Sequence, residues 1–387
     1  METRKNLRFI LSNFKIKKDQ YYFNYANYSK VPKSVIRETH KLNSLFGYGS
    51  VVSKKVEKYQ NEVRSHVAAV FGGKSENWYF SGPVSSAIST LLLQIIRDFK
   101  VINNKIPTIS TYKRNFPSLV LPAISLEKFG LCKLDLIEYP ENGIDENWCN
   151  KNINSDIFII SLVDFFNGQI HDLDLIYSIC KSKNVNLIVD FSQFPYWGIL
   201  NVNNYPGVVF VSVLHKWLMG YPGHSISYID YESIPFFLGW QNISNIIDYD
   251  LENIIKTHEI SNKSPLPFCS FEGAFKFVNS IGLDKINRYI KSSSNGLLEK
   301  LNDLGSKYPG LKIIQNNENF RGIKSSIISI SVGSKTKDLF KYLYNYNIIA
   351  SYFNVELIRF STSFTTSKEE IDFLCGKIDK WCEINLT

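Results

Sequence analysis

Short apolar runs alternate with amphipathic stretches along the first two thirds of the chain. Apolar and charged residues recur at helical spacing at 33–46, 51–71, 85–99 and 172–183. Apolar runs bounded by turn residues predict strands at 77–82, 106–111, 132–139, 155–163, 186–191 and 208–213. The run at 155–163 is apolar almost throughout, which is typical of a strand buried on both faces. Strands that alternate with helices predict a parallel sheet covered on both sides.

The pattern changes after about residue 265. Helical spacing continues at 271–304, 335–346 and 368–384, with strands expected at 326–332 and 356–363. This change predicts a smaller α+β domain packed on the first. We expect three parts: an N-terminal arm at 1–20, a large domain at 21–265 and a small C-terminal domain at 266–387.

Composition narrows the classes of protein that need to be considered. The formal net charge is +8 over 387 residues, but the lysines are scattered and no basic run alternates with aromatic residues. We therefore expect no nucleic-acid partner. The six cysteines form no CxxC pair, and no run approaches the roughly 20 apolar residues of a membrane span. These features indicate a cytoplasmic protein with reduced thiols, no metal site and no membrane association.

Two polar residues at predicted strand ends carry the candidate chemistry. Lys216 follows the apolar strand at 208–213, and Asp190 lies at the end of the strand before it. Burial disfavours the charged form of a lysine and makes its amine nucleophilic. A lysine that forms a Schiff base and an aspartate that pairs with a ring nitrogen together predict a pyridoxal phosphate site. Taken singly, Lys216 could equally be a surface lysine with a buried stem, and Asp190 could be a helix cap.

Two further features allow more than one interpretation. Ser85 and Ser86 begin a predicted helix, whose free backbone N–H groups could bind a phosphate, although serine at this position is more often an N-cap. Arg359 is a lone arginine in the apolar strand at 356–363. It could bind a substrate carboxylate through two hydrogen bonds or form a structural salt bridge.

Three segments resemble the class V aminotransferase superfamily of fold-type I pyridoxal phosphate enzymes. They are VDFSQFPYWG at 189–198, SVLHKW at 212–217 and IRFSTSFTTSKEEID at 358–372. The resemblance extends from about Tyr22 to Leu374. The superfamily includes cysteine desulfurases, kynureninases and isopenicillin-N-epimerase-like proteins. It implies an α/β fold with a large domain, whose mainly parallel seven-stranded sheet lies between helices, and a smaller C-terminal α+β domain.

The resemblance implies roles for individual residues. Lys216 would form the Schiff base and shuttle the α-proton, Asp190 would pair with the ring nitrogen, and Gln193 would hydrogen-bond the phenolic oxygen. Arg359 would hold the substrate carboxylate. The phosphate would be bound by Ser85, Ser212, His215 and the backbone around Val84. The catalytic centre would consist of Lys216, Asp190 and His215.

Two more segments are similar to the kynureninase branch. RNFPSL at 114–119 would place Phe116 on the cofactor ring, and FFLGWQNIS at 236–244 would place Trp240 near the phosphate. Ser264 corresponds to a position from which the family reaches the phosphate of a neighbouring subunit. We therefore expect a homodimer with the active site at the subunit boundary.

The chain also departs from these relatives. Kynureninases carry tyrosine before the Schiff-base lysine, where this chain has His215, and desulfurases carry asparagine near Phe165 and a stacking histidine at the place of Phe116. The stretch at 345–356 lacks the nucleophilic cysteine of many desulfurases, so a persulfide mechanism is not expected. We expect a C–S or C–C lyase-like enzyme, or a transferase, acting at Cα or Cβ of a small or aromatic amino acid. The alternatives are an aminotransferase, an epimerase, or a catalytically inactive scaffold protein with this fold.

Overall fold

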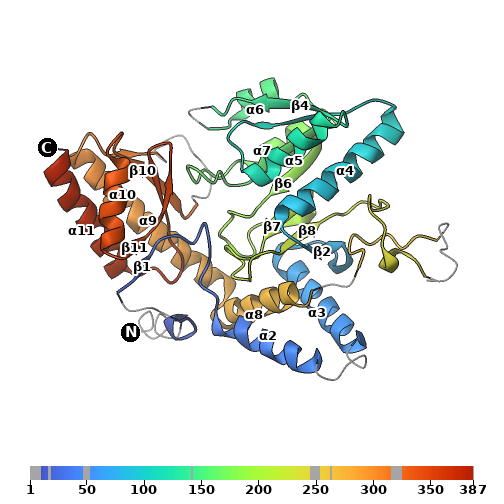
Figure 1. The fold of residues 1–387 in the computed structure, drawn as a ribbon, viewed down its shortest axis with the longest axis horizontal. Helices are drawn as coiled ribbons and strands as arrows, with labels where there is room; N and C mark the ends of the chain where they lie inside the picture. Colours follow the sequence, from blue (N-terminus) through green and yellow to red (C-terminus); the bar gives the residue numbers. More distant parts are fainter. Residues whose placement is uncertain are drawn as a thin grey trace.

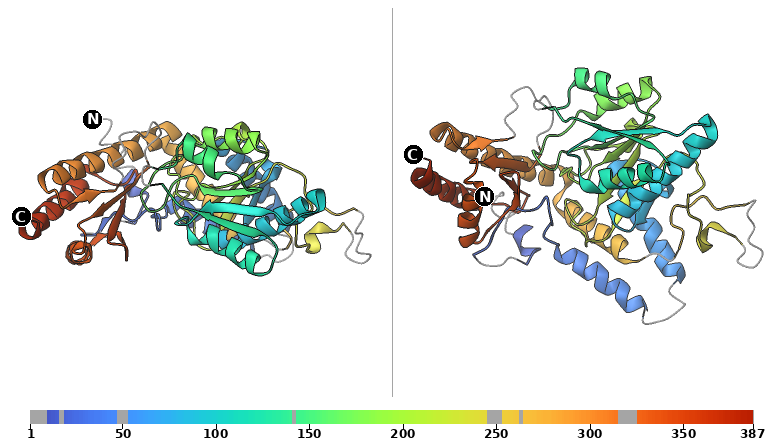
Figure 2. Two further views of the ribbon diagram at one scale, coloured as in Figure 1. Left: turned by 90° about the horizontal axis from the view of Figure 1, so that it is seen from above. Right: turned by 45° about the horizontal axis from the view of Figure 1, so that its top comes forward.

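The computed structural model describes residues 10–15, 19–46, 53–140, 143–244, 253–261, 264–314 and 325–386. The chain folds into a large sheet-and-helix body and a smaller C-terminal body beside it (Figures 1 and 2). The strands of the large body are β2 (Trp78–Ser81), β3 (Thr108–Tyr112), β4 (Lys133–Ile137), β5 (Ile157–Ser161), β6 (Asn186–Asp190), β7 (Val209–Val213) and β8 (Ser225–Tyr228). Its helices are α2 (Lys33–Phe46), α3 (Ser53–Phe71), α4 (Val84–Asn103), α5 (Pro117–Lys128), α6 (Glu146–Asn152), α7 (Leu173–Ser182) and α8 (Leu266–Ile281).

These strands form one seven-stranded sheet in the order β2-β8-β7-β6-β5-β3-β4. The four neighbouring pairs from β7 through β6, β5 and β3 to β4 are parallel, and β8 runs antiparallel to both of its neighbours. The predicted fold class is therefore confirmed. The apolar pattern had not indicated β8, which is a short strand of sequence SISY with alternating serines.

The central strands are buried on both faces, as the apolar run at 155–163 predicted. Ile157 and Ile159 belong to the core cluster beneath α4 and α5, whereas Phe158 and Ile160 belong to the cluster on the opposite face, with α3, α7 and α8. This division follows from the alternation of side chains along a strand. Figure 2 shows α4 and α5 on one side of the sheet and α6 and α7 on the other.

The long helix α9 (Leu283–Lys307) joins the two bodies. Its first half contributes Ile286 and Ile290 to the core of the large body, and its second half contributes Leu297 and Leu301 to the core of the small body. Gly282, at φ +98°, separates α9 from α8, so the predicted helical stretch at 271–304 is two helices. The domain boundary at residue 265 stays a prediction. The helix α8, which begins just after this residue, packs on α2 of the large body.

The small body is built on a four-stranded antiparallel sheet in the order β12-β13-β10-β9. Its elements are β9 (Lys312–Ile313), β10 (Ile327–Ser331), α10 (Thr336–Asn345), β11 (Ile348–Ile349), β12 (Ser351–Phe353), β13 (Leu357–Ser361) and α11 (Lys368–Asn385). Near the N-terminus, β1 (Tyr21–Tyr22) pairs in parallel with β11. The segment that follows β1 therefore starts in the small body and leads into the large one (Figure 1).

Within the part of the chain that the structure describes, no helix combines the length and the apolar character that crossing a bilayer requires.

Candidate functional site

The candidate site lies at the carboxyl edge of the sheet, where β6 and β7 end side by side. Asp190 is the last residue of β6 and pairs with Val211 of β7, and the loop after β7 carries Lys216. Open α/β sheets bind their ligands at this edge. A small cavity there is lined by Phe116, Ser161, Val163, Phe165, Asp190, Ser192, Gln193 and Lys216.

Lys216 and Asp190 are both buried, with exposed fractions of 7% and 5%. Burial lowers the pKa of Lys216 to about 8; the carboxylate of Asp190 opposes this shift, and the guanidinium of Arg359 adds to it. Burial also raises the pKa of Asp190, against hydrogen bonds from Ser192 and the charge of Lys216. The lysine therefore has an amine that is partly neutral near neutral pH, as the sequence predicted from its burial.

The backbone around Lys216 is anchored on both sides. Before it, the carbonyl of His215 accepts a hydrogen bond from the Ser29 amide at 2.9 Å. After it, the carbonyl of Trp217 accepts one from the Trp197 indole at 3.1 Å. The Trp217 indole in turn donates to Gln193 Oε1 at 3.2 Å. These bonds fix the backbone on both sides of Lys216 and so keep its side chain in the cavity wall. Without them, a lysine side chain would turn outward into water.

Gln193 lines the cavity and is already engaged at both ends of its amide. Oε1 accepts from Trp217, and Nε2 donates to the Ala26 carbonyl at 2.9 Å. One amide hydrogen remains for another acceptor, because a glutamine NH₂ group has two donors. The predicted contact with a phenolic oxygen thus stays a prediction, compatible with this geometry.

Phe116 faces Lys216 across the cavity. The Lys216 Nζ atom lies 5.0 Å from the centre of the Phe116 ring. Phe116 is the residue before α5, and its backbone N–H is held by the side chain of Asn115 at 2.8 Å. Asn115 is itself bound by the hydroxyl of Ser161 at 2.7 Å, so β5 fixes the position of the ring.

Two of the predicted phosphate-binding residues, Val84 and Ser85, lie in the first turn of α4. Val84 is buried and begins this helix, and Ser85 donates a hydrogen bond to Ser118 of α5 at 2.8 Å. The residue before the helix, Pro83, makes no side-chain cap, which leaves the first turn suited to an anion. The Gly82 carbonyl in the same turn accepts from Ser225 of β8 at 2.7 Å.

Ser212 lies on β7 and His215 lies in the loop that follows this strand. Ser212 is buried near the end of β7, beside β8. The His215 ring stands 5.0 Å from the Tyr28 ring, and its buried Nδ1 atom has no hydrogen-bond partner among the described residues. Burial and the charge of Lys216 lower the pKa of His215 to about 4, so the imidazole is neutral. Their contacts with a phosphate stay predictions.

Arg359 lies on β13 of the small body and reaches the large one. Its Nη1 atom donates to the Phe165 carbonyl at 2.8 Å, and its Nη2 atom donates to Ser351 at 3.3 Å. The side chain is 5% exposed, and its Nε atom has no hydrogen-bond partner in the part of the chain that the structure describes. Burial lowers the pKa of Arg359 to about 10, so the group remains cationic. A buried cation with an unpaired donor suits a carboxylate ligand.

Trp240 and Ser264 lie away from the cavity within this single chain. Trp240 begins the short helix η4 (Trp240–Asn242) and is about half exposed, at 51%. Ser264 is exposed, and its hydroxyl accepts from the Leu266 amide at 3.3 Å. Neither residue lines the cavity around Lys216. Their predicted contacts with a phosphate stay predictions.

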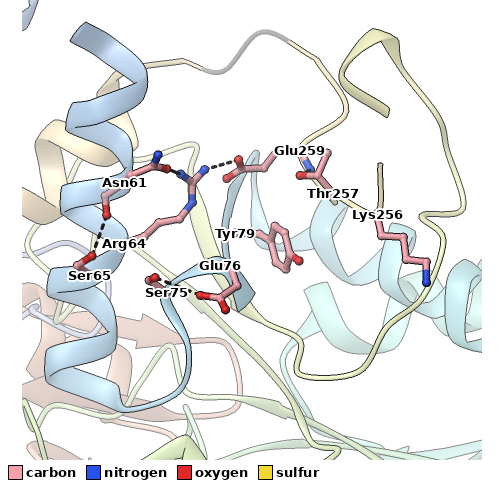
Figure 3. A pocket seen from close by; sticks show the side chains of 9 residues that line it. All are labelled: Asn61, Arg64, Ser65, Ser75, Glu76, Tyr79, Lys256, Thr257 and Glu259. Carbon is pink, nitrogen blue, oxygen red and sulfur yellow. Dashed lines mark hydrogen bonds and ion pairs between the residues drawn. The ribbon is translucent and has the colours of Figure 1, made fainter. Parts of the chain in front are cut away.

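A larger open pocket of about 540 Å³ lies between α3 and the segment at 256–259 (Figure 3). Its main charged groups bind each other: Arg64 pairs with Glu259 and also donates to Asn61 at 2.8 Å. Glu259 accepts from the Phe80 amide at 2.9 Å. The residues predicted for the site do not line this pocket. Because its ion pair is already satisfied, the pocket is a weaker candidate than the cavity at Lys216, despite its size.

The structure also brings residues to the site that the sequence did not indicate. Ser161 and Val163 line the cavity, and Ser351 and Phe353 approach Arg359 from β12. Asn24 accepts a hydrogen bond from Ser351 at 2.7 Å. No local pattern marks Ser351, Phe353 and Asn24, because they meet the site only through the packing of the two bodies.

The family model for class V aminotransferases matches residues 21–374. No characterised protein sequence matches the chain significantly.

Solved structures share the fold at low sequence identity. A cysteine desulfurase from Thermococcus onnurineus is 19% identical, covers 97% of this chain and 98% of its own, and superposes with a TM-score of 0.82. The cysteine desulfurase CsdA from Escherichia coli is 14% identical over 98% of both chains, with a TM-score of 0.79. The cystine C–S lyase C-DES is 15% identical over 94% of this chain and 98% of its own, with a TM-score of 0.78.

The family match covers nearly the whole chain, including the lysine, the aspartate and the arginine strand that carried the resemblance. Class V aminotransferases are pyridoxal phosphate enzymes, which agrees with the cofactor predicted from the sequence. This chain belongs to the class V aminotransferase family.

Proposed function

We propose that the protein is a pyridoxal phosphate enzyme that cleaves a bond at Cβ of an amino acid, with C–S lysis as the leading reaction. The observation that carries the proposal is the buried amine of Lys216, which shares one cavity with the buried carboxylate of Asp190. Phe116 lines the same cavity, and Arg359 is close enough to influence the pKa of the lysine. A lysine, an acid, an aromatic ring and an arginine are the groups that this chemistry requires.

The residues of the cavity fit the cofactor by their chemistry. Lys216 would hold its aldehyde carbon, Asp190 would face its ring nitrogen, and Phe116 would cover one face of the ring. The first turn of α4, with Ser85, would bind the phosphate. When bound, pyridoxal phosphate supplies an electron-poor ring that stabilises negative charge at the substrate Cα.

Lys216 is suited to moving the proton at Cα. Its pKa of about 8 leaves a fraction of the amine neutral near neutral pH, so Nζ can take a proton and return it. Arg359 would bind the substrate carboxylate and fix the orientation of the bonds at Cα. The desolvated cavity strengthens both interactions, because water does not screen them.

The cysteines support a lyase that works without a protein thiol. All six are buried, and burial raises the pKa of each thiol to about 11 or about 12. The thiolate is the nucleophilic form, so these side chains are poor sulfur acceptors. Sulfur would therefore leave with the product, in keeping with the fold shared with a cystine C–S lyase.

We also propose a homodimer. The segment between β8 and α8 exposes several large apolar side chains: Ile234, Phe236, Phe237, Leu238, Trp240 and Ile255. Several exposed apolar side chains along one connecting segment favour an interface. Trp240 and Ser264 would then reach the site of the partner subunit, which would explain why they lie away from the cavity of their own chain. Analytical ultracentrifugation should give twice the chain mass.

Reduction with borohydride tests the central assignment. The purified protein should be coloured, should bleach on reduction, and should carry the reduced cofactor on a peptide that contains Lys216. Lys216→Ala should abolish this modification, whereas Lys128→Ala, on the exposed end of α5, should not. Colourless protein that takes up no cofactor would instead favour a scaffold protein.

Product analysis then separates the two leading reactions. Release of sulfide or a persulfide together with pyruvate from a sulfur-containing amino acid indicates a lyase. A requirement for a keto-acid acceptor indicates an aminotransferase, which is the second candidate, because the same groups serve both reactions up to removal of the α-proton.

A further inference from the structure

Four phenylalanine rings form a continuous wall between the candidate lysine and the candidate arginine. The members of this phenylalanine wall are Phe116, Phe165, Phe166 and Phe353. Building on the proposed function, we propose that the wall binds the substrate side chain and that the substrate is an amino acid with an uncharged, apolar side chain. Thioethers belong to this class, since sulfur packs well at the edges of aromatic rings.

The rings contact one another in sequence. The centre of the Phe116 ring lies 5.3 Å from that of Phe165, which lies 6.0 Å from that of Phe353. Phe166 lies 6.1 Å from Phe353 and 6.4 Å from Phe165. All of these spacings fall within the range of direct ring–ring contact. The wall is assembled from the loop before α5, the loop after β5 and strand β12.

The two ends of the wall meet the groups that would hold the substrate. At one end Lys216 Nζ is 5.0 Å from the centre of Phe116, and at the other Arg359 Cζ is 5.1 Å from the centre of Phe353. An amino acid with its carboxylate at Arg359 and its Cα near Lys216 would therefore lie along the wall. Its side chain would meet aromatic carbon.

The wall is not part of either closed core. All four rings are only partly buried, and they lie outside the buried core clusters of both bodies. Partly exposed aromatic rings that gather beside a binding cavity are available to a ligand, and covering them releases water from apolar surface.

In the described part of the chain, the charged side chains of Arg114 and Asp164 beside the phenylalanine wall already have partners. Arg114 Cζ stands 5.2 Å from the centre of the Phe166 ring and 3.8 Å from that of Tyr139, and Arg114 Nε lies 3.7 Å from Asp164 Oδ2. Asp164 is fully buried and accepts the backbone N–H of Phe166 at 3.0 Å. A second carboxylate on the substrate would lose its water. Of the three cations at the described rings, Arg359 would be occupied by the first carboxylate, Lys216 would hold the cofactor, and Arg114 faces Asp164.

A cationic side chain is disfavoured for a different reason. Aromatic rings attract cations, but Lys216, Arg359 and Arg114 already lie against three of the four rings. A further positive charge would be repelled by these groups in a site of low dielectric. An uncharged side chain avoids both costs.

The test compares amino acids of the same shape and different charge. L-leucine and L-aspartate are nearly isosteric, and both are added to the holoprotein while the absorbance of the bound cofactor reports equilibrium binding. We expect L-leucine to bind at least about tenfold more tightly, the lower end of what one apolar contact contributes to selectivity. L-lysine should bind no better than L-aspartate.

Variants of the phenylalanine wall test whether its rings cause the preference for L-leucine over L-aspartate. Phe353→Ala and Phe165→Ala should each weaken L-leucine binding by about tenfold and leave L-aspartate binding nearly unchanged. The carbonyl of Phe165 that binds Arg359 is backbone and remains in the variant. Phe129→Ala is the matched control, because this ring is 76% exposed at the end of α5.

The possible failures can be told apart. A protein that takes up no pyridoxal phosphate overturns the proposed function, and this inference with it. A holoprotein that binds L-leucine and L-aspartate equally, or binds L-lysine most tightly, overturns only the inference. Wall variants that melt at lower temperature but keep the wild-type preference would show that the rings serve packing alone.

Discussion

Lys216 Nζ stands 5.0 Å from the centre of the Phe116 ring, although one residue follows β7 and the other precedes α5. The contact joins two loops at the same edge of the sheet. It places an amine of lowered pKa against the aromatic surface that would cover a cofactor ring.

The first prediction concerns the pH dependence of cofactor uptake. Only a neutral amine attacks an aldehyde, and burial lowers the pKa of Lys216 to about 8. The rate at which the apoprotein takes up pyridoxal phosphate should therefore rise with pH and level off above about 8. An unperturbed lysine would level off above roughly 10. Stopped-flow absorbance measures the rate.

Asp190→Asn tests how the carboxylate of Asp190 affects the pKa of Lys216. The carboxylate raises the pKa of Lys216, so its removal should move the midpoint to lower pH. Asp135→Asn, on the exposed edge strand β4, is the control and should leave the midpoint in place. A midpoint that stays fixed or rises in Asp190→Asn would contradict the electrostatic assignment.

Arg359→Lys should weaken amino-acid binding while leaving cofactor binding intact. Lysine keeps the charge but loses the planar fork and the bonds to Phe165 and Ser351. We expect a loss of about 1.5–3 kcal/mol in the free energy of binding, the contribution of a hydrogen bond to a charged group. The loss is measured as the change in KM for an α-amino acid. The same change is measured for an amine that has the same side chain but lacks the carboxylate.

The comparison with the amine decides the role of the arginine. If Arg359 binds the carboxylate, the amine should be insensitive to the substitution. Arg288→Lys, on the exposed face of α9, should change neither substrate. An equal loss for acid and amine would mean that Arg359 acts only on the packing between the two bodies.

Asn24 should position Arg359 through Ser351. Ser351 donates to Asn24 Oδ1 at 2.7 Å and accepts from Arg359 Nη2 at 3.3 Å. Asn24→Ala and Ser351→Ala should each raise KM severalfold with a smaller effect on kcat, because both leave the reacting groups in place. The double variant should be non-additive by about 0.5–3 kcal/mol.

A double-mutant cycle on KM tests this relay. Asn27→Ala, at an exposed position of the same segment, should have little effect on either constant. Additive losses in the double variant would show that Asn24 and Ser351 act independently.

Gly168 should be needed for the approach of the two bodies. It has φ +73°, and an added Cβ would lie 2.3 Å from the carbonyl oxygen of Ile327 in β10. Gly130 has a similar φ of +70°, but an added Cβ would meet nothing within 4 Å. Gly130→Ala should therefore cost only the strain of a left-handed residue, about 1–2 kcal/mol.

Gly168→Ala should cost about 1–3 kcal/mol more, because the backbone of β10 must also move. Denaturant unfolding of both variants measures the difference. KM should rise in Gly168→Ala as well, since the same loop carries the Phe165 carbonyl that binds Arg359. Equal stability of the two variants would argue against a steric contact between the bodies.

Much of the fold was predictable from the sequence, because local patterns report local burial. The apolar run that became β5 indicated a strand covered on both faces, and Ile157–Ser161 is buried throughout. Parallel strands end at one edge of a sheet, so Asp190 after β6 and Lys216 after β7 could be expected together. The short strand β8 could not, because SISY gains its burial from its neighbours and not from its own apolar pattern.

The sequence by itself determined the alternation of strands and helices, the lysine and the aspartate at the strand ends, and the arginine strand. Only the tertiary structure decided which distant residues complete the site. Phe353, Ser351 and Asn24 carry no local signal, and they reach Arg359 because β12 pairs with β13 and the N-terminal segment crosses between the bodies. Periodicity encodes which face of an element is buried, whereas the partner of that face is selected by the packing of the whole chain.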